Sequence, residues 1–567
     1  MERILRIFNK ESGSINQAAL LLGFLTFFSQ ILALFRDRFL AYFIGPGATL
    51  DTYYAAFRVP DLIFISIASL ASVTVIIPFL LAKMSARQLA DGDGDRVTDQ
   101  AQKYLNDIFT VFLAVMIFVS VIAFLFMPYF VLFIAPGFTP FYQAKVVVLS
   151  RIMLLSPILL GLSNLFGAIS QLFHKFFIYS LSPVFYNLGI IAGIIFLYQI
   201  FGIYGLALGV ALGASLHFGI QALSASRSGF VIKFSSSVNF TEVKNLALIS
   251  LPRTLGMAFN NMALIYIISL ASFLQTGSIS IFNLAFNLQS VPLNIIGISY
   301  AVAAFPSLTK SFSIGNKEEF KKHLKGAGRA IVFWSLPVIF LFIVVRAQIV
   351  RVLLGAGSFS WDDTRLVAAC LAIFAVSVVA QGMTTLLSRS YYAVGNTKRP
   401  LVVNFLCSLF IIVLSYLFIN LFENILVFRY FIESLLKVND IPGTAVLMLP
   451  LAYSVGTILN FILHWIFVKK DFIPHESFIA KTFFQSLGAS FFLGLVTYLS
   501  LNIFSPVFGT TTFWGVFLQG FISGIFGIIA AVIVLYLLKS EELQEVIVTL
   551  RTKFWQAKII APSQEGL

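Results

Sequence analysis

Residues 28–64 read FSQILALFRDRFLAYFIGPGATLDTYYAAFRVPDLIF, an apolar stretch that contains charged side chains. The charged residues are Arg36, Asp37, Arg38, Asp51, Arg58 and Asp61. An ionised side chain at membrane depth is costly unless it faces a protein interior or a wet cavity, so it marks a functional site by default. We therefore predict that this stretch is the first wall of a polar cavity in a transporter.

Two other interpretations of these charges stay open at this point. Arg36 and Arg38 can extend along the helix to the membrane interface, and Arg58 and Asp61, three residues apart, can neutralise each other. Six apolar residues, 39–44, follow Arg38 before the Gly-Pro-Gly turn. The arginines therefore do not stand at a plain helix end, which favours the cavity.

Composition assigns the chain to the polytopic membrane proteins. Hydrophobic residues make up 59% of the 567 residues and charged residues only 11%, with a mean hydropathy of +0.94. So little polar surface cannot cover a soluble globule. The net charge of +14 is expected in loops near anionic lipid, and we predict no nucleic-acid partner. Cys370 and Cys407 lie in apolar segments, which argues against a disulfide or a cysteine metal site.

Windows of about 20 apolar residues predict an all-α protein with about fourteen membrane-spanning helices. They are expected at residues 17–44, 51–82, 104–135, 146–170, 181–200, 203–224, 246–273, 278–309, 330–349, 364–388, 400–420, 443–468, 482–505 and 512–538. Residues 421–438 and 541–560 carry too many charges to span and are predicted to lie on the outer and inner membrane surfaces. The basic stretch 317–329 is predicted to be a solvated connector.

Loop charges give an independent test of this count. With the amino terminus inside, the inner segments hold 27 Lys and Arg residues and the outer segments hold 6. This asymmetry is the positive-inside pattern, and one missed or invented helix in mid-chain would destroy it. We therefore predict an even number of helices with both termini in the cytoplasm.

A weak internal repeat predicts the domain organisation. Residues 163–191 and 384–412 both run helix, short basic loop, proline, helix, and IPFLLAKMS (77–85) resembles FPSLTKSFS (305–313) six helices later. Such a displacement indicates two like-oriented six-helix lobes with a substrate site between them. The predicted parts are the lobes 1–224 and 225–470, two extra helices in 471–538, and a cytoplasmic amphipathic tail, 539–567.

The predicted eighth helix contains a proline near its middle. Pro292 removes a backbone donor, so a helix break is expected there, where only a cavity or a neighbouring helix can satisfy the freed carbonyl. Asn287 precedes this break, and its amide is suited either to substrate or to a neighbouring helix.

No constellation typical of an enzyme is present in the sequence. The five histidines show no metal-ligand spacing, and there is no GxxxxGK nucleotide loop. We predict a transporter without catalytic residues, metal or cofactor. Its transport would be driven by the membrane potential, an ion gradient or the gradient of the cargo itself.

Five stretches point together to one family. They are FRDRFLAYFIGPGATLDTYYAAFRVPDL (35–62), SPVFYNLGII (182–191), LPRTLGMA (251–258), QSVPLNIIGISYAVAAFPSLTKSF (289–312) and SRSYYAVGNTKRP (388–400). In this order and spacing, and over nearly the whole chain, they resemble the MurJ (MviN) lipid II flippases of the multidrug/oligosaccharidyl-lipid/polysaccharide exporter superfamily. The resemblance implies a V-shaped pair of lobes, a cationic central cavity for pyrophosphate and sugars, and a groove at helices 13 and 14 for the lipid tail.

The resemblance also implies the substrate-binding residues. Arg36 matches a cavity arginine of the family, Asp51 an aspartate at the start of the second helix, and Arg58 a basic position. Gln30 and Asn287 stand where the family usually has arginines, and we keep both as candidates.

The reduced arginine set leaves two explanations. Phe64 also replaces a familiar arginine, so one of four such cavity arginines is present. One explanation is that other cations compensate, and the candidates for these are Arg38, Arg58, Arg151 and Arg253. The other explanation is that the cargo is less anionic.

The function implied by the resemblance is flipping of lipid II from the inner to the outer leaflet of the bacterial cytoplasmic membrane by alternating access. Its partners would be lipid II or a similar undecaprenyl-pyrophosphate-linked glycan, membrane lipids, and peptidoglycan synthesis enzymes. Two alternatives remain: an exporter of another lipid-linked glycan or of amphipathic drugs with the same fold, and an inactive membrane scaffold for cell-wall synthesis.

Overall fold

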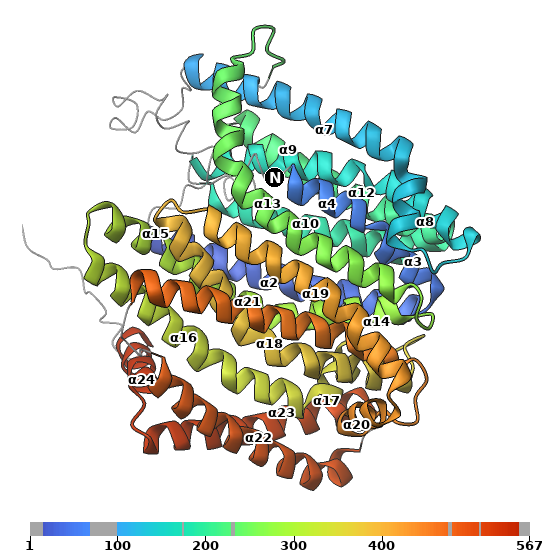
Figure 1. The fold of residues 1–567 in the computed structure, drawn as a ribbon, viewed down its shortest axis with the longest axis vertical. Helices are drawn as coiled ribbons and strands as arrows, with labels where there is room; N and C mark the ends of the chain where they lie inside the picture. The colour runs from blue at the N-terminus through green and yellow to red at the C-terminus, as the bar shows by residue number, and fades with distance from the viewer. Residues whose placement is uncertain are drawn as a thin grey trace, which may run out of the picture. The chain divides into compact units, whose positions relative to one another are not determined.

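The computed structural model describes residues 15–67, 99–172, 175–227, 233–473, 479–509 and 512–554, and every element assigned within them is a helix (Figure 1). Among these residues, twelve helices are long and apolar enough to cross a membrane. The all-α membrane fold is therefore confirmed, and the count of fourteen stays a prediction.

The helices follow the predicted spans closely. In chain order they are α2 (Ile15–Phe43), α3 (Ala48–Ala56), α4 (Arg58–Ser66), α7 (Asp99–Ile134), α8 (Pro140–Met153), α9 (Leu155–Leu172), α10 (Phe176–Ala192), η2 (Gly193–Leu197), α11 (Tyr198–Phe201), α12 (Ile203–Arg227), α13 (Phe240–Ala271), α14 (Ser278–Pro292), η3 (Leu293–Ile298), α15 (Ser299–Ser313), α16 (Lys317–Val344), α17 (Arg346–Leu353), α18 (Trp361–Ala393), α19 (Lys398–Asn424), α20 (Leu426–Leu436), η4 (Thr444–Leu447), α21 (Met448–Phe472), α22 (Ala480–Phe508), α23 (Phe513–Leu537) and α24 (Glu541–Phe554).

The two predicted spans that contain the charged stretch are described in part. The first, 17–44, is α2. The second, 51–82, begins as α3 and α4, which meet at Phe57, and its residues 68–82 lie outside the described part of the chain.

The prediction of a connector at 317–329 is wrong, because α16 begins at Lys317. The Asn316 side chain caps this helix by accepting a hydrogen bond from the backbone N–H of Glu319 at 3.0 Å. Phe320 and Leu324, four residues apart, are both buried. The spacing of Phe320 and Leu324 indicates a helix, but the many positive charges of 317–329 led to the prediction of a connector.

Two predicted surface helices are helical in the structure. The segment 421–438 contains α20, and α19 extends to Asn424 before it. The tail 541–560 is helical as α24, and its residues 555–560 lie outside the described part. Their positions on the membrane surface stay predictions.

By its internal contacts the chain divides into two compact units. Unit 1 comprises the described residues of Met1–Leu288, Leu353–Ile373 and Thr397–Leu459, and unit 2 those of Gln289–Val352, Phe374–Asn396 and Asn460–Leu567. The division into 1–224, 225–470, 471–538 and 539–567 rests on the sequence repeat and stays a prediction.

In unit 1, α12 approaches α10 and η2 through glycines. A Cβ on Gly209 would lie 2.5 Å from the Gly193 Cα, and one on Gly189 would lie 2.3 Å from the Gly213 Cα. Small residues allow helix backbones to meet in this way in membranes. α10 also packs against α2, so this close contact indirectly supports the charged helix.

In unit 2, α22 packs along α23 and α16 (Figure 1). The tail helix α24 is anchored to them: Leu543 is buried in a cluster with Phe333, Leu493 and Leu535, and Lys481 Nζ lies 2.6 Å from a Glu541 carboxylate oxygen. The first turns of the predicted tail are therefore part of the folded unit.

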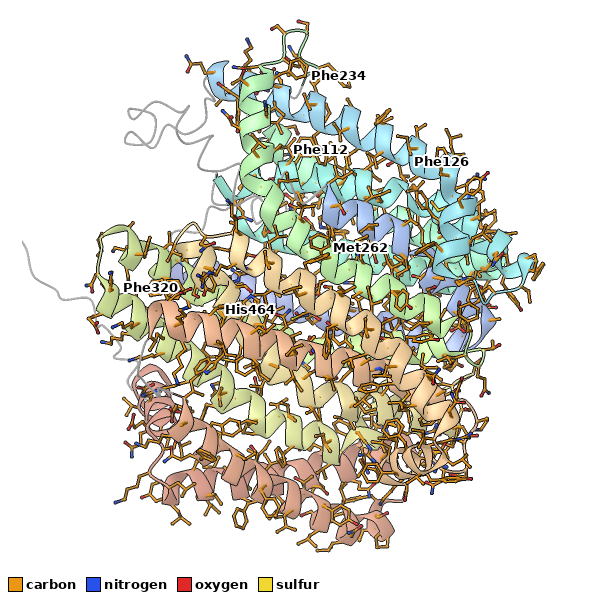
Figure 2. All side chains as sticks on the ribbon, viewed as in Figure 1. Phe112, Phe126, Phe234, Met262, Phe320 and His464 are labelled. Carbon is orange, nitrogen blue, oxygen red and sulfur yellow. The ribbon has the colours of Figure 1, made fainter. Side chains whose placement is uncertain are left out.

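Many apolar side chains point away from the protein. On α7, Phe112 is buried whereas Phe126 is 51% exposed (Figure 2). An exposed apolar helix face of this kind is what a membrane-spanning helix presents to lipid.

At Pro292 the chain changes helix type and continues. α14 ends at this proline and the π-helical η3 follows directly. A wider π turn is one way in which a helix accommodates a missing backbone donor.

We predict that Gly209→Ala lowers the free energy of unfolding by about 1–3 kcal/mol, because the added methyl meets the backbone of Gly193. Thermal unfolding of the purified protein in detergent measures the effect. Gly219→Ala is the matched control, since it lies on the same helix with no atom within 4 Å of its Cβ position. Equal unfolding midpoints for the two variants would contradict the packing argument.

Candidate functional site

Arg36 and Asp37 on α2 form the centre of a polar network. The Arg36 guanidinium donates to Asp37 Oδ1 through Nε at 3.0 Å and through Nη2 at 2.8 Å. The Asp37 side chain is 3% exposed and the Arg36 side chain 21%. Pairing lowers the cost of keeping both charges among apolar helices. The arginine keeps an accessible edge while the aspartate is enclosed.

Two asparagines from other helices of unit 1 complete the network. Asn187 on α10 accepts a hydrogen bond from Arg36 Nη1 at 3.3 Å, and Asn287 on α14 donates from Nδ2 to Asp37 Oδ2 at 3.0 Å. The Asp37 carboxylate thus holds Arg36 with one oxygen and Asn287 with the other. Three helices that are distant in the sequence meet at this ion pair.

Asp51 holds the beginning of α14. Its Oδ2 accepts from the Gly277 backbone N–H at 2.6 Å, and its Oδ1 accepts from the Ser280 N–H at 2.7 Å and from the Ser280 hydroxyl at 2.5 Å. A carboxylate satisfies the free N–H groups and the dipole at a helix amino terminus. Because both oxygens are used in this way, the geometry gives Asp51 a role in holding α3 against α14.

Arg58 is attached to α14 as well. Its Nη2 donates to Asn283 Oδ1, while its buried Nε has no hydrogen-bond partner. The hydrogen bond of Arg58 therefore joins two helices, whereas the sequence had suggested Asp61, one turn further along α4, as an alternative partner. Arg58 is buried, so it is less accessible to a ligand than Arg36.

The hydrogen bonds described for Arg36 and Asp37 do not include the remaining candidates. Gln30 is half-buried on α2, six residues before Arg36, and the hydrogen bonds described around Arg36 do not include it. Two of the proposed compensating cations bond to backbone: Arg38 donates to the Leu353 carbonyl at 3.3 Å, and Arg151 to the Phe124 carbonyl at 3.0 Å. The side chain of Arg253 lies outside the described part.

Asp37 and Asn187 belong to the network although neither was predicted from the sequence as a substrate-binding residue. Asp37 was visible as a charge, but its pairing with a neighbour on the same helix is decided by side-chain direction. Asn187 is uncharged and lies 151 residues from Arg36 along the chain. Its one sequence signal was its place within SPVFYNLGII.

Residues 44–47, 272–277 and 354–360 form a loop cluster in unit 1. The Ser358 backbone N–H donates to the Tyr42 carbonyl at 3.0 Å, and a Cβ on Gly45 would lie 2.6 Å from the Ser358 carbonyl oxygen. Gly277 approaches Pro46 and bonds Asp51. At Gly45 backbone meets backbone too closely for a side chain, and Gly277 has a positive φ of 98° that favours glycine.

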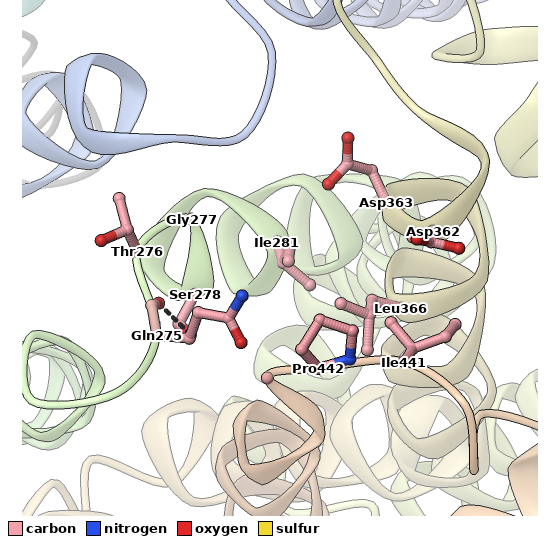
Figure 3. A pocket seen from close by; sticks show the side chains of 11 residues that line it. Gln275, Thr276, Gly277, Ser278, Ile281, Asp362, Asp363, Leu366, Ile441 and Pro442 are labelled. Carbon is pink, nitrogen blue, oxygen red and sulfur yellow. Dashed lines mark hydrogen bonds between the residues drawn. The ribbon is translucent and has the colours of Figure 1, made fainter.

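A pocket of about 200 Å³ lies beside the loop cluster in unit 1 (Figure 3). Asp362 and Asp363 stand on one side of it, and Ile281, Leu366 and Pro442 also line it. Its lining contains no Lys or Arg, so its charge is unsuited to a phosphate. Of the two arginines bonded to the amides described above, Arg36 keeps a partly exposed side chain whereas Arg58 is buried.

The described residues contain no group of three or more His, Cys, Asp or Glu side chains that could hold a metal ion. Two buried histidines have other partners: His217 Nδ1 lies 2.7 Å from the Ser163 hydroxyl, and His464 Nε2 lies 3.1 Å from the Ser388 hydroxyl. These pairs link helices within each unit.

Many apolar helices with a charged network held between them define a multi-pass membrane transporter. Residues 40–519 match the family model described as lipid II flippase MurJ, and the chain belongs to this family. The family is one of transporters, and a place in peptidoglycan synthesis follows from membership.

Individual relatives agree with this assignment. The probable lipid II flippase MurJ of Rickettsia prowazekii is 27% identical over 68% of this chain and 74% of its own length. That of Buchnera aphidicola is 25% identical over 86% of this chain and 90% of its own. A solved structure described as lipid II flippase MurJ, inward closed conformation, shares the fold with a TM-score of 0.71 at 21% identity, covering 93% of this chain and 100% of that chain.

We predict that Asp51→Asn destabilises the protein by about 1–2 kcal/mol, because an amide replaces one acceptor of the α14 cap with a donor. The unfolding midpoint in detergent measures this change. Asp61→Asn is the control, since Asp61 lies outside the cap. A midpoint equal to that of wild type would show that the cap does not stabilise α14.

We also predict a pH-dependent contribution from Asp440, which lies between α20 and η4. Arg365 donates to both of its carboxylate oxygens, at 2.9 and 2.6 Å, and this hydrogen bonding lowers the pKa of Asp440 below its ordinary value of 3.8. A lowered folded-state pKa gives stability that is complete above the ordinary value and lost as the pH falls through the folded-state value.

The measurement is the difference in unfolding midpoint between wild type and Asp440→Asn. We expect a difference at pH 7 that disappears as the pH falls through the folded-state pKa of Asp440. Glu423→Gln, at an exposed carboxylate, controls for general acid effects. A difference that stays constant down to acid pH would rule out the ion pair as its cause.

Proposed function

We propose that this chain moves lipid II from the inner to the outer leaflet of the cytoplasmic membrane by alternating access, and that Arg36 contacts the pyrophosphate. Family membership supports the cargo. The observation that supports Arg36 is its geometry: three of the five N–H donors of an arginine are held by Asp37 and Asn187, and the side chain keeps 21% exposure. Paired donors on a fixed guanidinium match phosphate oxygens.

The loop cluster supports closure on one side. In the predicted orientation, with both termini in the cytoplasm, residues 44–47, 272–277 and 354–360 face the outside. Their backbone contacts and the Asp51 cap support the proposal that the outer side is closed in this state. In our proposal cargo enters from the inner side in this state, and the contacts separate when it leaves on the outer side.

The pairing of Arg36 reduces its electrostatic attraction for the pyrophosphate. Arg36 is paired with Asp37, so a pyrophosphate meets a guanidinium whose charge is already partly neutralised. We infer that much of the affinity comes from hydrogen bonds and from the rest of the cargo, with less from net positive charge. The membrane potential or an ion gradient is the proposed driving force, and collapsing each with ionophores in proteoliposomes tests it.

We predict that Arg36→Ala lowers lipid II translocation by about two orders of magnitude, because two charge-assisted hydrogen bonds are each worth roughly 1.5–3 kcal/mol. Purified protein in proteoliposomes, with translocation followed by accessibility of the lipid headgroup, gives the measurement. Arg151→Ala is the matched control, an arginine in a spanning segment that bonds the Phe124 carbonyl.

Three outcomes separate the hypotheses. Loss of transport in Arg36→Ala with near-normal transport in Arg151→Ala supports the proposal. Full transport by folded Arg36→Ala removes Arg36 from the substrate site. Folded wild type that does not move lipid II but moves another lipid-linked glycan would instead show a changed cargo.

A further inference from the structure

Asn187 on α10 touches the Arg36 guanidinium without adding charge. We propose that Asn187 is a positioning residue: it fixes Arg36 so that one N–H on each terminal nitrogen of the guanidinium stays available to an anionic group of the cargo. This inference rests on the proposed function and adds to it a residue that orients the phosphate contact.

The orientation of the Asn187 amide is set by its other neighbours. Its Nδ2 donates to the Pro183 carbonyl at 3.1 Å and to the Ser29 hydroxyl at 3.3 Å. With acceptors around the nitrogen, the oxygen Oδ1 is the atom that meets Arg36 Nη1. The reverse orientation would place a donor against the guanidinium and leave acceptors unpaired. The side chain is buried, so water is a poor substitute for these partners.

The pattern of bonds decides which donors remain. Asp37 accepts from Nε and Nη2, and Asn187 accepts from Nη1. Each terminal nitrogen carries two N–H groups, so one on each is left. Without Asn187, Nη1 would have both donors free, and rotation about the Asp37 contact would be less restricted. The asparagine therefore restricts Arg36 to one orientation before the cargo arrives.

The residue type suits this task. An aspartate would also accept from Nη1, but it would place a second carboxylate beside Asp37 and repel an anionic cargo. A leucine of similar size would offer no acceptor. Asparagine supplies the acceptor and leaves the charge of the site unchanged.

The helix that holds Asn187 is itself fixed. Gly189, two residues further on, lies against the backbone of Gly213, and a Cβ there would lie 2.3 Å from the Gly213 Cα. α10 packs on α2 and α12. The position of Asn187 relative to Arg36 is thus set by helix packing within unit 1.

The test is lipid II translocation by the full-length protein in proteoliposomes, measured over a range of lipid II concentrations. We expect Asn187→Leu to raise the half-saturating concentration about tenfold and to change the maximal rate less than about twofold, since the Arg36 guanidinium would then have to be ordered as the cargo binds. Gln221→Leu is the control: Gln221 on α12 donates to Ser182 on α10, the helix that carries Asn187, at 2.7 Å, and its described hydrogen bonds do not include Arg36. An unchanged half-saturating concentration in folded Asn187→Leu would overturn the proposal.

A second measurement asks whether Asn187 acts through Arg36. In an Arg36→Lys background, where the fork geometry is absent, we expect Asn187→Leu to have less than about a twofold effect on lipid II binding, read from the lipid-dependent shift of the unfolding midpoint. A tenfold effect that persists in this background would assign Asn187 to packing or to direct cargo contact.

Two further variants keep the proposal testable if Asn187→Leu does not fold. Asn187→Ser is too short to reach Arg36 and is expected to behave as Asn187→Leu. Asn187→Asp keeps the acceptor but adds negative charge, so we expect its half-saturating concentration to be at least as high as that of Asn187→Leu. Wild-type affinity in Asn187→Asp would refute the argument from charge. If wild type itself neither binds nor moves lipid II, the proposed function is wrong. If wild type is active and only the Asn187 variants behave differently from expectation, the proposed role of Asn187 is wrong.

Discussion

A charged side chain among apolar helices has to find its compensation within the protein, and the described site follows from this constraint. The Asp37 carboxylate is enclosed and bonds Arg36 and Asn287. Arg36 bonds Asp37 and Asn187, and retains donors on its terminal nitrogens. Breaking one member would leave another buried polar group unpaired, which costs more than the bond itself contributes. The network therefore holds α2, α10 and α14 together while keeping one cationic edge accessible.

The same physical chemistry gives Asp51 a different role from Arg36, although both were candidates for substrate contact. At the amino terminus of α14, Asp51 meets free backbone N–H groups and a hydroxyl, and both carboxylate oxygens are used. The neighbouring loop cluster is made from backbone contacts at Gly45 and Gly277. The cap and the Gly45 contact lie at helix ends, so they join these elements locally.

The prediction was best where length and apolarity alone decide the outcome. Most of the described spanning segments were located to within about six residues, because a helix that crosses lipid has to satisfy its own backbone. It failed at 317–329, where dense positive charge suggested a connector although Phe320 and Leu324 had helical spacing and are buried. Charge reports where a segment meets water, but it does not report whether the backbone is helical.

The sequence by itself determined the class of protein, the positions of most helices and the family, because apolar length, charge asymmetry and collinear motifs are properties of the chain. It also selected Arg36, since an arginine inside an apolar helix needs an explanation. Only the tertiary structure decided which neighbours meet that arginine: Asn187 lies 151 residues away and carries no charge. Hydrogen-bond partners are chosen by how helices pack and rotate against one another, and no local pattern in a single helix contains that information.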